Sequence, residues 1–198
     1  MTSTAKIARK IAKARPGEAF TPDDFGSLAS PTAVATALSR LSKRGVIDRA
    51  RKGIYYKPLL SRFGRGRIPT DIVAHMVTEG KAPGPAGPSA AQALGFTTQI
   101  PVHSTIAVVG NRPKGLTNVR FIERSNVGRV TAKLRPMEVA LLEVIRDKMK
   151  WAEISDSDAK LKILNLVANG EINIAKVLRA AKREPRRVET KLRELILD

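Results

Sequence analysis

The chain has 198 residues, of which 42% are hydrophobic, so it can bury a core and should not remain disordered. It contains no cysteine, which excludes disulfides, thiolate zinc sites and Fe–S clusters and favours a reducing cytoplasm as its location. No stretch of about 18 residues reads as a membrane span. We therefore expect a cytoplasmic protein with no membrane partner.

The charge is strongly basic and unevenly distributed. Lys and Arg number 36 against 18 Asp and Glu, a net charge of +18. Residues 1–70 carry +11, whereas residues 71–134 and 135–198 carry +4 and +3. A basic field of this size attracts polyanions. We expect the first third of the chain to meet the polyanion, unless the excess charge serves only solubility.

The first 60 residues predict three helices followed by a hairpin, which is the order of a winged helix-turn-helix. Ser30-Pro31 is a typical helix start, and Gly45 a typical helix end. Gly53 provides the flexible position of a hairpin turn. In chain order we expect a helix over 4–14, a strand at 18–20, a short helix from 22, a helix over 32–44, and strands over 46–49 and 54–57 joined by 50–53. Of Tyr55 and Tyr56, one should be packed and the other exposed.

The third helix has an apolar stripe, formed by Val34, Ala37, Leu38 and Leu41. The opposite side carries short hydroxyls and cations: Thr32, Thr36, Ser39, Arg40 and Lys43. Such residues approach a DNA groove closely and bond to bases or phosphates. Arg51 and Lys52 in the hairpin turn would contact phosphate or the minor groove. Each pattern alone is also typical of a core or a solvated surface, but their order favours DNA.

The rest of the chain predicts a linker and a second domain. Residues 61–69, SRFGRGRIP, are predicted as a flexible basic linker that could place Arg65 and Arg67 in a minor groove, although a plain interdomain linker is the preferred interpretation. Residues 70–198 predict a small α+β domain that ends in helices. Its elements are helices over 69–79, 89–94, 135–150, 158–168, 172–183 and 187–197, and two strands over 105–109 and 118–124 joined by a turn. The fold class expected for the whole chain is α+β.

Two stretches resemble a known family. PTAVATALSRLSKRGVIDRARKGIYY (31–56) resembles the start of AbiEi-type antitoxins, winged-helix proteins of bacterial abortive-infection and toxin–antitoxin operons. SAAQALGFTTQIP (89–101) and RPMEVALLEVIRD (135–147) are similar to the domain that follows in one branch of them. The resemblance implies a DNA-binding domain that represses its own operon at inverted repeats, and a carboxy-terminal domain that counters a nucleotidyltransferase-like toxin, with or without direct contact.

A catalytic role finds little support in the sequence. His75 and His103 have no metal-ligand spacing, phosphate-binding and nucleophile motifs are missing, and Asp156-Ser157-Asp158 is typical of a helix start. We expect no enzyme activity, no catalytic residue, no cofactor and no metal. The alternatives are a basic winged-helix protein that binds structured RNA, a transcriptional regulator without antitoxin activity, and a domain that only docks on a protein.

Overall fold

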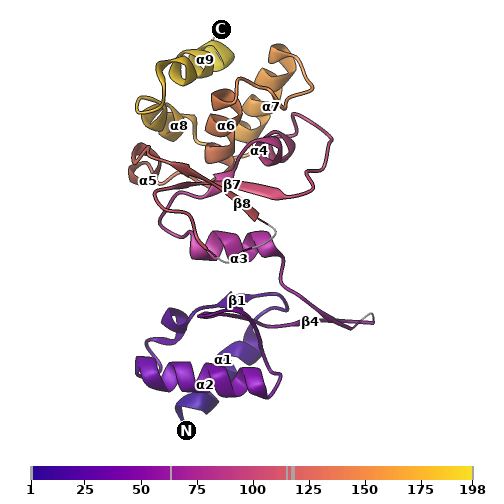
Figure 1. Ribbon diagram of the computed structural model, residues 1–198, viewed down its shortest axis with the longest axis vertical. Helices are drawn as coiled ribbons and strands as arrows, with labels where there is room; N and C mark the ends of the chain where they lie inside the picture. The colour runs from indigo at the N-terminus through magenta and orange to yellow at the C-terminus, as the bar shows by residue number, and fades with distance from the viewer. Residues whose placement is uncertain (1, 63, 115, 117–118, 198) are drawn as a thin grey trace. The chain divides into compact units, whose positions relative to one another are not determined.

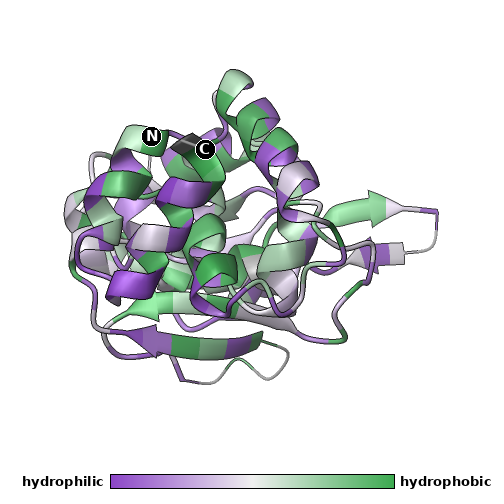
Figure 2. Ribbon diagram, turned by 90° about the horizontal axis from the view of Figure 1, so that it is seen from above, coloured by the Kyte–Doolittle hydropathy of each residue, from purple (hydrophilic) through white to green (hydrophobic). Residues whose placement is uncertain are grey.

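The computed structural model describes residues 2–62, 64–114, 116 and 119–197, and the chain divides into two compact units, Met1–Val73 and Ala74–Asp198. Both units combine helices with short strands, which confirms the predicted α+β class (Figure 1). The helices alternate hydrophilic and hydrophobic residues, as expected for elements with one buried face (Figure 2). None of the helices in these ranges has the length and apolar character needed to span a bilayer.

The first unit begins with three helical segments and a three-stranded antiparallel sheet of order β1-β3-β2. Its elements are α1 (Ser3–Lys13), β1 (Ala19–Phe20), the 3-10 helix η1 (Pro22–Phe25), α2 (Pro31–Lys43), β2 (Asp48–Arg51) and β3 (Ile54–Tyr56). The short helix from Pro22 is thus a 3-10 turn, whose start is held by the Thr21 amide donating to Asp24 Oδ2 at 2.6 Å. The strand predicted at 46–49 begins two residues later.

The core of this unit lies between α1, α2 and the sheet. The stripe predicted on the third helix is confirmed, since Val34, Ala37 and Leu38 are fully buried together with Ile7 and Ile11 of α1. Lys57 follows β3, and its Nζ donates to the carbonyl oxygens of Ala12 and Ala14 at 2.8 and 2.9 Å. A cation at the carboxyl end of α1 also suits the helix dipole. The buried stripe of α2 therefore fixes the rotation of this helix about its own axis.

Tyr55 and Tyr56 are both buried, with 7% and 5% of their surface exposed, so the expectation that one of them is exposed is wrong. Alternation along a strand exposes every second side chain only when one face of the sheet is solvated. Here Tyr55 joins the core, and the chain after β3 folds back so that the backbone of Ile68 reaches the Tyr56 hydroxyl. This returning segment covers the second face of β3.

The segment predicted as a linker, 61–69, contains part of a second hairpin and belongs to the first unit, which corrects that prediction. Strands β4 (Leu59–Ser61) and β5 (Gly64–Gly66) pair in antiparallel register, with Leu60 opposite Arg65. The Arg65 guanidinium donates to both carboxylate oxygens of Asp48 in β2, at 2.7 and 2.8 Å, and to the Gly45 carbonyl at 2.7 Å. The hairpin is therefore held to the first unit at its base.

The second unit has a sheet of order β6-β7-β8 and a group of helices. Its elements are α3 (Thr70–Val77), which crosses the boundary between the units, β6 (Gly84–Pro85), α4 (Pro88–Ala93), β7 (Ser104–Val109), β8 (Val119–Arg124), α5 (Gly128–Thr131), α6 (Pro136–Arg146), α7 (Asp156–Ala168), α8 (Ile174–Ala181) and α9 (Arg186–Leu197). β7 and β8 are parallel, with Ser104 aligned to Val119. The expectation that a turn alone joins them is wrong, because parallel neighbours cannot be joined as a hairpin.

The sheet of the second unit is covered on both faces (Figure 1). Ala107 of β7 lies in the cluster formed by the helices on one side, whereas Ile106 and Val108 cluster with Ala74 of α3 on the other. β6 approaches α6 so closely that a Cβ at Gly84 would lie 2.4 Å from the Val139 Cβ and 2.8 Å from the Pro136 carbonyl oxygen. Among the described residues, the hydrophobic cluster beneath these helices is larger than the cluster of the first unit.

Buried ion pairs connect the helices of the second unit. Arg129 of α5, 1% exposed, contacts Glu143 of α6 at 2.6 Å and donates through Nε to Glu184 at 2.7 Å. Arg124 at the end of β8 contacts Glu143 at 2.6 Å, and Arg146 pairs with Glu184. Burial by itself raises the pKa of Glu143, but Arg124 and Arg129 overcome it, so this pKa lies below its ordinary value. Both carboxylates are fully buried and paired.

Candidate nucleic-acid interface

Helix α2 presents all five predicted contact residues to solvent. Its buried stripe fixes which side faces outward, and the opposite side carries Thr32, Thr36, Ser39, Arg40 and Lys43, every one of them exposed. Thr36 and Arg40 are four residues apart, as are Ser39 and Lys43, so each pair lies on one helical face. The exposure predicted for these side chains is confirmed, and their role as DNA contacts stays a prediction.

The cations on this face are available to a ligand. Within the described residues neither Arg40 nor Lys43 makes an ion pair or a side-chain hydrogen bond. Each lies near the carboxyl end of α2, where a positive charge is favourable for the helix dipole and needs no carboxylate partner. The helix therefore holds two charged donors and three hydroxyls on one surface.

The hairpin after α2 places Lys52 at its tip. Residues Arg51 and Ile54 are paired, so the connecting loop consists of Lys52 and Gly53, and Gly53 adopts φ +80, which suits glycine. Lys52 is exposed, whereas Arg51 is half-buried and has partners within the protein. An irregularity between Arg49 and Arg51 shortens the predicted four-residue turn to two. Of the two residues predicted at the tip, Lys52 is the one presented fully to solvent.

Arg65 and Arg67, predicted to reach a minor groove, differ in the structure. Both are exposed, but Arg65 is engaged by Asp48 and Gly45, so its guanidinium supports the second hairpin. The pairing had one signal in the sequence, because Asp48 is the only acidic residue between positions 25 and 70. A lone carboxylate in a basic segment is a strong candidate for an arginine partner. Arg65 is therefore better described as a structural residue.

Further exposed cations lie on α1 and β2, where the sequence analysis assigned no contact. Lys6, Arg9 and Lys13 of α1 are exposed, and Lys10 lies over the Phe25 ring at 5.1 Å from its centroid. Arg49 of β2 is exposed and lies over the Tyr55 ring at 5.8 Å. The sequence signal of the α1 cations is the basic outer surface of an amphipathic helix, which is also typical of an ordinary solvated face.

The comparisons with known proteins give a family. A family model matches residues 6–116, more than half of the chain. The chain belongs to DUF6088, a family of unknown function. No curated protein matches this DUF6088 member. A crystal structure of the RV2827C protein from Mycobacterium tuberculosis is similar over 98% of this chain and 76% of that one, with a TM-score of 0.48 and 16% sequence identity.

The residues considered for metal binding have other surroundings in this DUF6088 member. Within the described part of the chain, no three His, Asp or Glu side chains gather as metal ligands would. Asp158 follows the α7 cap residue Ser155, whose hydroxyl oxygen accepts from the Asp158 amide at 3.1 Å, and Asp156 pairs with Lys191 at 2.6 Å. The interpretation of this acidic pair as a helix start is confirmed.

Proposed function

We propose that the first unit is a winged helix-turn-helix that binds double-stranded DNA in a sequence-specific manner. The observation that carries the proposal is the exposed face of α2, which combines Thr36 and Arg40 and is held outward by a fully buried stripe. Directly after it comes a hairpin with Lys52 at its tip. A recognition helix followed by a basic wing is a common arrangement for reading a major groove.

The two elements would divide the work of recognition. Thr36 and Arg40 lie about one helical turn apart on the exposed face of α2, so in this proposal they meet base edges, where arginine bonds two acceptors of guanine. Lys52 on a hairpin tip is suited to phosphate, which positions the protein without reading sequence. The net charge of +11 over residues 1–70 also favours binding to the phosphates of DNA.

The resemblance to AbiEi-type antitoxins extends the proposal to a biological role. The DNA site would be an inverted repeat in the promoter of the protein's own operon, and the second unit would counter a nucleotidyltransferase-like toxin. Co-expression of the full chain with the toxin from the neighbouring gene tests this role. In this proposal the double variant Arg40→Ala/Lys52→Ala loses repression and still rescues growth, whereas joint loss of both activities contradicts the division.

A competition experiment tests the DNA proposal itself. Fluorescence anisotropy of a labelled duplex from the operon promoter, bound by the full chain, is measured against unlabelled promoter duplex, scrambled duplex and a structured RNA hairpin of equal length. We expect promoter duplex to compete at least about tenfold better than scrambled duplex at physiological salt. Stronger competition by the RNA would favour the RNA-binding alternative. Binding that is absent at low salt would leave protein docking as the function of this unit.

A further inference from the structure

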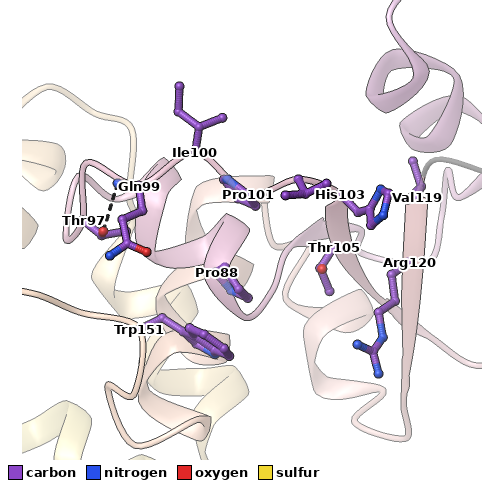
Figure 3. Close-up of a pocket in the computed structure, with 11 residues that line it drawn as sticks. Pro88, Thr97, Gln99, Ile100, Pro101, His103, Thr105, Val119, Arg120 and Trp151 are labelled. Carbon is purple, nitrogen blue, oxygen red and sulfur yellow. Dashed lines mark hydrogen bonds between the residues drawn. The ribbon is translucent and has the colours of Figure 1, made fainter.

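A pocket of about 520 Å³ opens in the second unit where β7 and β8 begin (Figure 3). Its walls come from four separate parts of the chain: the start of α4, the segment 97–103, the first residues of the two parallel strands, and Trp151 after α6. A volume of this size falls within the range of cavities that hold small molecules, about 300–1,000 Å³. None of these residues belongs to the surface proposed above for DNA.

One wall of the pocket is apolar and aromatic. Trp151 and Pro88 lie beside each other there (Figure 3). The Nζ atom of Lys150 lies 4.7 Å from the centroid of the Trp151 ring. The segment 97–103 is fixed in place because Thr97 and Gln99 both bond to Glu153. Ile100 of this segment is 84% exposed and points away from the pocket. A planar ring would therefore be held by Trp151 and Pro88.

The other wall is polar and basic. Thr105 is 8% exposed, its amide donates to the Ser89 hydroxyl at 3.0 Å and its carbonyl accepts from Ala86, but its own hydroxyl has no partner within the described residues. Arg120 of β8 and His103 complete this wall, and the residues that line the pocket include no carboxylate. A hydroxyl that makes no hydrogen bond within the described residues and is open to the pocket can be satisfied by a ligand.

We propose that this pocket binds a small aromatic anion, with its ring against Trp151 and Pro88 and its negative group toward Arg120 and the Thr105 hydroxyl. Charge decides the class of ligand, because the wall opposite the ring offers a guanidinium and an imidazole and no acid. A bond between guanidinium and carboxylate or phosphate is also stronger than one to a neutral acceptor. The site is independent of DNA binding by the first unit.

The chain supplies its own probe, because Trp151 is its single tryptophan. The fluorescence of the full-length protein is titrated with benzoate and phenyl phosphate as aromatic anions, with benzamide as the neutral match and cyclohexanecarboxylate as the saturated match. We expect a saturable change with the aromatic anions, and at least about tenfold weaker binding of benzamide. Equal binding of benzoate and benzamide, or no saturable response to either anion, overturns the proposal.

Two variants and a matched control locate the bound group. Arg120→Gln is expected to weaken benzoate about tenfold and leave benzamide unchanged, and Thr105→Val is expected to weaken benzoate by a smaller factor. Arg179→Gln removes an exposed arginine of α8 that lies outside the pocket, so it should bind like the unaltered protein. Thermal unfolding of each variant confirms that it is folded. Benzoate affinity that is equal in Arg120→Gln and Arg179→Gln contradicts the assignment.

Discussion

The two units differ in where some of their cations lie. In the first unit the cations lie mainly on the surface, as Arg40, Lys43 and Lys52 do. In the second unit Arg129 is buried between two buried glutamates. Residues 1–73 hold 15 basic and 5 acidic side chains, whereas residues 74–198 hold 21 and 13. Cations thus remain on the surface where few carboxylates accompany them, and some of them form an internal network where carboxylates are more frequent.

The largest expected effect is the loss of a buried partner in the second unit. Arg129→Ala leaves Glu143 and Glu184 buried with fewer cations, so it should lower the free energy of unfolding by about 3–5 kcal/mol. Urea denaturation followed by circular dichroism measures the loss. Arg112→Ala is the matched control, because Arg112 is exposed and lies 4.0 Å from Glu123. Similar losses of unfolding free energy in the two variants would show that the buried arginine is no more important for stability than the exposed one.

Acid should weaken the same network. The folded-state pKa of Glu143 is lowered, so ionised Glu143 contributes stability at pH values above the pKa of unfolded glutamate, about 4.3. That contribution is lost as the pH falls through the lower folded-state pKa. Glu143→Gln should therefore be less stable than the unaltered protein at neutral pH, and the gap in melting temperature should narrow in acid. A gap that widens on acidification would contradict the lowered pKa.

Arg40→Ala tests the surface cations through binding. It should cost about 1–3 kcal/mol on the specific duplex and relax the preference at one base pair, with no change in stability, because the side chain is exposed. Anisotropy with single-base variants of the duplex is the measurement. Equal weakening on specific and scrambled DNA would place Arg40 on the backbone of the duplex.

Lys52→Ala should have a smaller and more uniform effect. A lost phosphate contact weakens all sequences alike and reduces the slope of log K against log salt by about one unit. Isotherms over a salt series on both duplexes give this slope. An effect confined to the specific duplex would instead show that Lys52 contacts a base edge.

The smallest expected effect concerns Arg65, whose partner Asp48 is partly exposed. Exposed ion pairs contribute little to stability, so Arg65→Ala should leave the midpoint of unfolding nearly unchanged. Chemical denaturation measures this midpoint, and Arg67→Ala is the neighbouring control. A loss that approaches the one expected for Arg129→Ala would show that the second hairpin is essential to the first unit.

The sequence predicted those features of the structure that follow from residue spacing within a single helix. The stripe of α2 and the exposure of Thr36 and Arg40 follow from residue spacing along one helix, and the structure has both. The hairpin β4–β5 was missed because β5 consists only of glycine and arginine, and because its base depends on Asp48, 17 positions before Arg65. Such distant pairings leave only a weak signal in a single sequence.

The second unit shows the same limit more strongly. α6 was predicted from one apolar face, yet Glu138 and Glu143 on its remaining surface are also fully buried. Glu143 is paired with arginines from β8 and α5, and Glu138 accepts from Arg135 and from the Asn173 amide, partners that no periodicity within α6 indicates. The parallel pairing of β7 and β8, and the pocket at their start, likewise depend on segments that meet only after folding.

The close approach of β6 to α6 has an evolutionary consequence. Alanine at position 84 would place its methyl group 2.4 Å from a carbon of Val139 and 2.8 Å from a backbone oxygen of Pro136. A smaller residue at 139 would relieve only the first clash, since a backbone atom cannot be exchanged by mutation. A saturation library at position 84 should therefore yield only glycine among folded variants. Substitutions in this part of the family should accumulate at the neighbouring positions and leave Gly84 unchanged.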